Sequence, residues 1–174
     1  MFSSGAPAFI APLSLSNVLT VLAALICLWT MSPQANGGVW RLWRLAMPAA
    51  FAAVVALVLL ASVFDASWQH DGEWLAAFVL GGLIGRARGW SLPVAIDQMW
   101  GLVRLPKSKD GLLAAFGIVV ASAIDFTSAT LEEPVVEPQH VAAGAALFAG
   151  FIGCRALAII VRSTRAPHVQ LYDA

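Results

Sequence analysis

Charged residues are scarce in this sequence. Only 11% of its 174 residues are Asp, Glu, Lys or Arg, whereas about 25% is usual for a soluble domain. Hydrophobic residues make up 60% of the chain, and the mean hydropathy is +0.81. The ten basic and ten acidic residues cancel, so the chain has no overall positive field of the kind that holds nucleic-acid phosphates. This composition excludes an ordinary soluble domain and argues against nucleic acid as a partner.

Basic residues are missing from the N-terminal part of the chain. None precedes Arg41, whereas a cleavable secretory signal begins with a positively charged segment. The first apolar run is therefore expected to be a retained membrane helix.

The sequence contains five apolar runs. A helix needs about 20 residues to cross the hydrocarbon core of a bilayer, and four of the five runs are near that length. The third run is shorter, and it is completed by polar residues and by Arg86 and Arg88, whose side chains can snorkel to the interface. We predict an all-α integral membrane bundle of five transmembrane helices, forming a single transmembrane domain over residues 1–174. The predicted spans are residues 15–32, 45–64, 72–88, 111–128 and 140–162.

The basic residues predict the orientation of this bundle. If all five runs cross, the segments before residue 15, from 65 to 73 and from 128 to 140 lie on one side and contain no Lys or Arg. Apart from Arg155, which lies within the last run, every basic residue falls on the other side: Arg41, Arg44, Arg86, Arg88, Arg104, Lys107, Lys109, Arg162 and Arg165. Because cytoplasmic loops are rich in Lys and Arg, the N-terminus is predicted outside and the C-terminus inside.

Acidic residues and tryptophans agree with this orientation. Most acidic residues fall on or near the outer side, where we interpret them as a solvated surface: Asp65, Asp71, Glu73, Asp125, Glu132, Glu133 and Glu137. The tryptophans flank the predicted boundaries, as in the aromatic belts of membrane proteins.

The inner segment between the third and fourth runs is the longest one. Residues 91–97 and 99–105 are two β-tolerant stretches separated by a short polar break and followed by Pro106. They predict a short cytoplasmic β-hairpin. An interfacial helix over residues 94–103 fits the same letters.

Small residues recur at four-residue spacing on two predicted helices. One stripe is Gly81, Gly85 and Gly89, and the other is Ala142, Ala146, Gly150 and Cys154. Such stripes let helix backbones approach closely in lipid. We expect them to pack helices together, either within one chain or between copies.

Ionisable groups near the hydrocarbon are the candidate functional residues, because they are expensive to keep there. Arg155 can either snorkel to the inner headgroups or bind an anion, a lipid phosphate or a cluster of carbonyls. Asp125 either caps the outer boundary or is functional, and Arg86 lies at the inner turn.

Residues that would indicate a catalytic, metal or cofactor site are not found. Cys27 and Cys154 lie inside apolar runs and are interpreted as packing residues. His70 and His140 are expected outside and His168 inside, so no two histidines suit haem ligation. The sequence contains neither a nucleophile elbow nor a phosphate-binding loop. We therefore predict no catalytic residue, no metal and no cofactor.

Several short stretches carry a resemblance. They are Gly81-Gly-Leu-Ile-Gly85-Arg86, then Asp97, then Gly101-Leu-Val-Arg-Leu-Pro106-Lys-Ser108, and finally Gly150, Gly153 and Arg155. In these stretches the chain resembles a family of small bacterial polytopic membrane proteins without an established activity, and more distantly the CcdC-like proteins named from cytochrome c biogenesis loci. The resemblance covers residues 74–162 and implies a helical fold and a bacterial cytoplasmic (inner) membrane location. Asp110 and the acidic outer loop depart from it.

Two functional hypotheses follow. The leading one is a non-enzymatic accessory or assembly component that docks through its small-residue stripes, as a homo-oligomer or within a larger membrane complex. The alternative is a small permease or lipid-handling protein that uses Arg155 and Asp125. A membrane-embedded enzyme ranks third.

Overall fold

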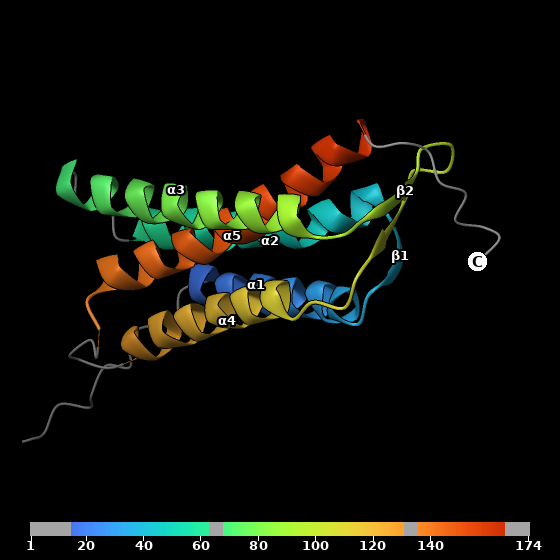
Figure 1. The fold of residues 1–174 in the computed structure, drawn as a ribbon. Coiled ribbons are helices and arrows are strands. Elements are labelled where there is room, and N and C mark those ends of the chain that lie inside the picture. The colour runs from blue at the N-terminus through green and yellow to red at the C-terminus, as the bar shows by residue number, and fades with distance from the viewer. Residues whose placement is uncertain (1–14, 63–67, 131–135, 166–174) are drawn as a thin grey trace, which may run out of the picture.

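The computed structural model describes residues 15–62, 68–130 and 136–165, and within them the chain forms five helices and three short strands (Figure 1). The helices lie side by side as an elongated bundle, and the strands gather at one end of it. In chain order the elements are α1 (Leu15–Ala35), β1 (Gly38–Arg41), α2 (Leu42–Ser62), α3 (Trp68–Ser91), β2 (Ala95–Asp97), β3 (Leu102–Leu105), α4 (Asp110–Ser128) and α5 (Pro138–Ser163).

Four of these helices, α1, α2, α4 and α5, are long and apolar enough to cross a membrane. The expectation of a mostly helical membrane protein is therefore confirmed. Helix α3 has 24 residues, more than the run that predicted it, because it also takes in polar residues at both ends. The other helix boundaries lie within a few residues of the predicted ones, although Phe64, the expected end of the second span, falls outside the described residues.

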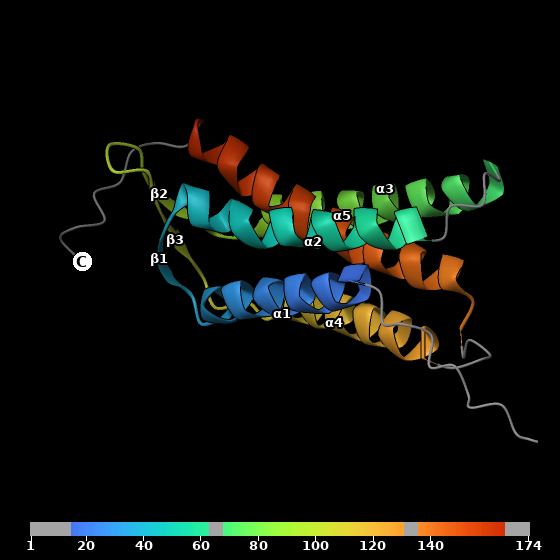
Figure 2. The ribbon, with the colours of Figure 1, turned by 180° about the vertical axis from the view of Figure 1, so that it is seen from behind.

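Figures 1 and 2 show α1 and α4 beneath the other three helices, from opposite sides. Helix α3 packs on α5, α5 and α2 form the middle, and α1 and α4 pair beneath them. The centre is filled largely by alanines that are fully buried, among them Ala24, Ala52, Ala115 and Ala145. Small side chains at these positions let the helices approach closely. Large apolar side chains such as Leu22, Leu57 and Leu113 point outward instead, as lipid-facing helices require.

The three strands form one antiparallel sheet in the order β1-β3-β2. Trp40 lies opposite Val103, and Val103 lies opposite Ile96 on its other side. The stretch expected to be a hairpin or an interfacial helix therefore contains two paired strands. The side of the membrane on which they lie stays a prediction.

Strand β1 was not anticipated from the sequence. It lies between α1 and α2, comes directly after Gly37 and begins at Gly38, and both glycines have positive φ angles. A Cβ atom at Gly37 would lie 2.9 Å from the carbonyl oxygen of Leu105, so this glycine permits the close approach of β1 to β3. The strands close a second small core that contains Leu45 and Ile159 from the helices.

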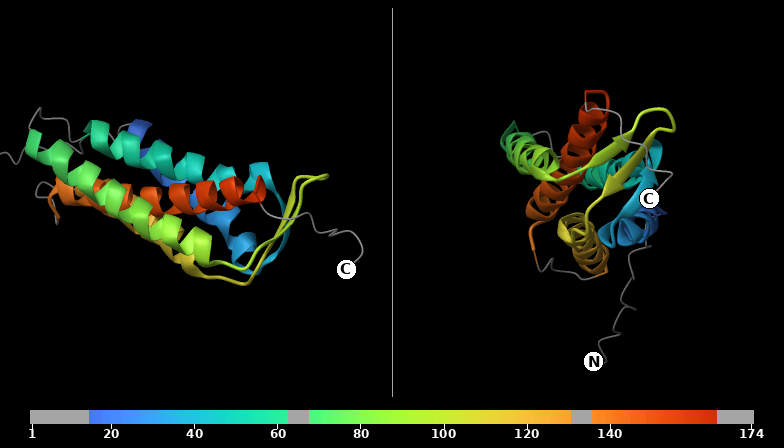
Figure 3. Two further views of the ribbon diagram at one scale, coloured as in Figure 1. Left: turned by 45° about the horizontal axis from the view of Figure 1, so that its top comes forward. Right: turned by 45° about the vertical axis from the view of Figure 1, so that its right-hand side comes forward.

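All five helices have one terminus at the same end of the bundle, which we call the sheet end (Figure 3). Helices α1, α3 and α5 finish there, and α2 and α4 begin there. The basic residues are found at or close to the sheet end, whereas Asp71, Glu73, Asp125 and Glu137 lie toward the other end. Asp65, Glu132 and Glu133, which were expected with the latter group, lie outside the described residues.

Candidate functional site

The glycine stripe of α3 packs directly against α5. A Cβ atom added at Gly81 would lie 1.9 Å from the carbonyl oxygen of Leu147, and one at Gly85 would lie 2.2 Å from that of Phe151. From the other side, a Cβ atom at Gly150 would lie 2.2 Å from the carbonyl oxygen of Phe78. These glycines and Ala146 are buried. Apart from Cys154, which is partly exposed, the two stripes are thus buried between helices of the same chain.

Gly89 continues this contact to Arg155. A Cβ atom at Gly89 would lie 2.8 Å from the carbonyl oxygen of Arg155 and 2.7 Å from the Cβ of Ala158. The close approach of α3 and α5 therefore covers the backbone from which the Arg155 side chain leaves.

Arg155 is buried within the bundle. Its residue exposure is 5%, and its Nη1 lies 3.2 Å from the position of a Cβ at Gly111, the second residue of α4. The Nε atom is buried and has no hydrogen-bond partner among the described residues. The guanidinium therefore turns across the bundle toward the start of α4 instead of reaching the surface.

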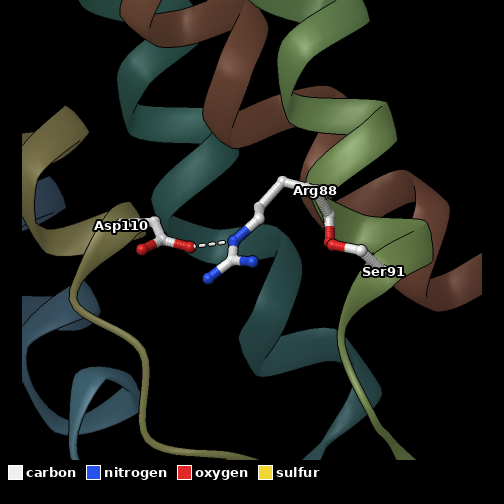
Figure 4. Close-up of polar contacts among 3 residues, drawn as sticks. All are labelled: Arg88, Ser91 and Asp110. Atoms are coloured by element: carbon white, nitrogen blue, oxygen red, sulfur yellow. Dashed lines mark hydrogen bonds and ion pairs between the residues drawn. The ribbon is translucent and has the colours of Figure 1, made fainter.

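An ion pair stands beside Arg155. Arg88, near the end of α3, donates through Nε to the carboxylate of Asp110, the first residue of α4 (Figure 4). Arg155 is attracted by the charge of Asp110 and repelled by that of Arg88. We call Arg88, Asp110 and Arg155 the Arg155 cluster. It holds two guanidinium groups and one carboxylate, and hence one uncompensated positive charge.

The start of α4 adds to this positive character. Lys109, its N-cap residue, provides no side-chain cap. The first backbone N–H groups of a helix lack partners within the helix and carry a partial positive charge. Gly111 brings this turn close to Arg155, since a Cβ atom there would lie 3.2 Å from Nη1 of Arg155 and 2.8 Å from Sδ of Met31.

Arg162 shows how the guanidinium of an arginine with a structural role finds hydrogen-bond acceptors in this protein. Its Nη1 donates to the carbonyl oxygens of Gly89 and Leu92, both at 2.8 Å, and its guanidinium lies over the ring of Trp90, 5.9 Å from the centroid. These bonds cap the C-terminal end of α3. Arg155, two turns earlier on the same helix, has no such acceptors among the residues that the structure describes.

The structure does not bring the other candidates to Arg155. Asp125 is half-buried near the far end of α4, about 22 Å along the helix from Asp110 at 1.5 Å per residue. Arg86 is exposed and lines a separate crevice of about 300 Å³ with Trp90 and Cys154. The pairing of Arg88 with Asp110 was missed from the sequence, where Asp110 had no assigned role.

The described residues also contain no group of three or more His, Cys, Asp and Glu side chains that would hold a metal ion. His168 lies outside the described residues, as does the side chain of His70. His140 pairs with Glu137, one turn away on an exposed surface.

Comparisons with known proteins add no assignment to this geometry: no family model, no curated protein and no solved structure matches the chain.

Proposed function

We propose that this protein is a non-enzymatic, membrane-embedded binding protein that holds an anionic group beside Arg155 at the sheet end. The ligand group is a phosphate or a carboxylate, carried either by a lipid headgroup or by a small soluble molecule. The proposal takes up the lipid-handling hypothesis, with the Arg155 cluster in place of the pair Arg155 and Asp125.

The burial of Arg155 is the observation that carries the proposal. A guanidinium stays protonated in proteins, and removing an ion from water costs several kcal/mol unless hydrogen bonds and an opposite charge compensate. Asp110 is the nearby carboxylate, and its hydrogen bond goes to Arg88. A bound anion would accept from the unpartnered Nε of Arg155 and from the first N–H groups of α4, a common anion-binding element.

The competing hypothesis, an accessory component that docks through small-residue stripes, loses the feature that favoured it. Gly81, Gly85 and Gly150 are in contact with the backbone of the neighbouring helix in the same chain. Association with a second copy or a larger complex would have to use other surfaces.

We further propose that α3 also crosses the membrane, in addition to α1, α2, α4 and α5, and that the sheet end faces the cytoplasm of a bacterial cell. Its 24 residues extend about 36 Å, enough for a hydrocarbon core of about 30 Å, and it lies alongside α5. A reporter fused within residues 106–109 tests this orientation. A signal from outside the cytoplasm would overturn it.

Arg155→Met tests the binding site, because it removes the charge while keeping much of the side-chain volume. The purified protein in mild detergent is first incubated with phosphatidylglycerol, and the lipid that it retains is measured by native mass spectrometry. In a separate experiment, its binding of ³³P-labelled inorganic phosphate is measured by equilibrium dialysis. We expect at least one probe to bind and its binding to fall at least tenfold in Arg155→Met. Arg165→Gln removes an exposed charge from the same end and is expected to bind as the unsubstituted chain does. Retention of the lipid alone identifies a headgroup as the source of the anion, and binding of free phosphate identifies a soluble ligand.

Gly111→Ala is the second variant, in case Arg155→Met does not fold. Its methyl group would lie 2.8 Å from Sδ of Met31 and 3.2 Å from Nη1 of Arg155, so it crowds the guanidinium without removing its charge, and binding is again expected to fall. The proposal is wrong if neither probe binds, or if both variants bind the probes as tightly as the unsubstituted chain.

A further inference from the structure

A cavity separate from the Arg155 cluster lies between α1 and α2 at the sheet end. These two helices pack together and are joined there by β1, as the view from behind shows (Figure 2). The cavity has a volume of about 280 Å³, and we call it the tryptophan crevice. Its lining residues are Trp29, Thr30, Pro33 and Gln34 of α1, Trp40 of β1, and Trp43, Arg44 and Met47 of α2.

Three indole rings give the crevice its apolar walls. Trp29 and Trp43 are exposed, whereas Trp40 is partly buried against the sheet core. The indole Nε1 of Trp40 is buried and has no hydrogen-bond acceptor among the described residues. A buried Trp N–H usually has a partner, so Trp40, a lining residue of the crevice, carries a donor that is left unused among the described residues.

Arg44 supplies the charge of the crevice. Its guanidinium lies 5.5 Å from the ring centroid of Trp43, its side chain is exposed, and it makes no ion pair with any acidic residue in the described part of the chain. No lining residue is acidic. The crevice thus combines an apolar slot, a hydrogen-bond donor and an uncompensated positive charge.

Local backbone chemistry holds these groups in place. Pro48 has no N–H and cannot donate to the carbonyl oxygen of Arg44, one turn earlier in α2. The side-chain Nε2 of Gln34 donates to that oxygen instead, at 3.1 Å. This bond links α1 to α2 through Gln34, a side chain that itself lines the crevice.

We propose that the tryptophan crevice binds a phospholipid with an anionic headgroup. An acyl chain segment lies against the indole rings, an ester or phosphate oxygen accepts from Nε1 of Trp40, and the headgroup charge pairs with Arg44. The volume is just below the roughly 300–1,000 Å³ typical of pockets for drug-sized ligands, and so suits part of a lipid better than a whole soluble molecule. Tryptophans mark the depth of the headgroups in membrane proteins, and basic side chains at that depth attract anionic lipids.

The proposal is tested with a photoreactive phosphatidylglycerol that carries a diazirine on one acyl chain. The full-length protein is reconstituted in vesicles with a trace of this lipid or with phosphatidylcholine bearing the same chain, and the labelled residues are mapped by mass spectrometry. We expect the crevice residues to be labelled several times more strongly by phosphatidylglycerol. Arg44→Gln should lower this labelling about fivefold, equivalent to about 1 kcal/mol per basic residue near an anionic surface. Trp40→Phe keeps the ring but removes the donor, and should lower it between about twofold and tenfold.

Two controls separate this site from other effects. Arg41→Gln removes an exposed charge three residues away that does not line the crevice, and should leave the labelling unchanged. Arg155→Met should also leave it unchanged, because the crevice and the Arg155 cluster use different residues. Equal labelling by the two lipids, an equal fall in Arg41→Gln and Arg44→Gln, or loss in Arg155→Met would each overturn the proposal.

Discussion

Gly81, where an added Cβ atom would come closer to a neighbour than at any other described glycine, permits a sharp test of how α3 and α5 pack. Gly81→Ala places a methyl group 1.9 Å from the carbonyl oxygen of Leu147. That oxygen belongs to the α5 backbone and cannot rotate away, so the two helices must separate. Real Cβ atoms essentially never come closer than 3.0 Å, and the shift required is therefore at least 3.0 − 1.9 = 1.1 Å. Overpacking of this kind costs about 1–3 kcal/mol.

Gly153→Ala on α5 is the matched control. A Cβ atom at Gly153 meets nothing within 4 Å, so this variant keeps the gain of about 0.5–1 kcal/mol from replacing a helical glycine by alanine without a clash. Both variants share that gain, and the difference between them isolates the α3–α5 contact. We expect the free energy of unfolding of Gly81→Ala to lie about 1–3 kcal/mol below that of Gly153→Ala.

The assay is thermal unfolding in a mild detergent, followed by circular dichroism. For a chain of this size, 1 kcal/mol corresponds to about 2–4 °C in Tm, so Gly81→Ala should unfold at least about 2 °C below Gly153→Ala. Equal Tm values for the two variants would refute the packing that places the glycine stripe inside the chain.

Two further predictions concern polar contacts at the sheet end. Gln34→Leu should lower the free energy of unfolding by about 1–3 kcal/mol, because it leaves the carbonyl oxygen of Arg44 without a donor. In a Pro48→Ala background this loss of stability should be smaller, since the restored backbone N–H of residue 48 can donate to the same oxygen. An equal loss in both backgrounds would contradict the role given to Gln34. The ion pair between Arg88 and Asp110 is partly exposed. A double-mutant cycle with Arg88→Gln and Asp110→Asn should therefore give a coupling energy of only about 0.2–1 kcal/mol. A coupling energy of several kcal/mol would show that the pair is far more buried than its exposure indicates.

Helix positions were largely predictable, because they depend on local properties. The length of an apolar run decides whether a helix can cross the hydrocarbon core, and α1, α2, α4 and α5 follow from such runs. Helix α3 was harder to place, because its polar ends extend beyond its apolar centre. The four-residue spacing of Gly81, Gly85 and Gly89 predicted a packing face, but it left open whether the partner was in the same chain.

The site was predictable only in part. Arg155 stood out because a charge within an apolar run is costly, but the sequence allowed both snorkelling and binding. Its burial depends on where α3 and α4 meet α5, and the position of Asp110 beside Arg88 depends on the same geometry. The tryptophan crevice had a weaker signal still, since tryptophans near a predicted membrane boundary are ordinarily interpreted as an aromatic belt.

What the sequence determined by itself is the class of the protein and the division of charge between its two ends, because apolar run length and the order of basic residues can be read along the chain. Tertiary structure alone decided which distant segments meet. Gly38 and Leu105 pair across more than 60 residues of chain, and Arg155 is enclosed by helices that begin or end far from it in sequence. Such contacts depend on the summed packing of the whole bundle, and no local pattern encodes them.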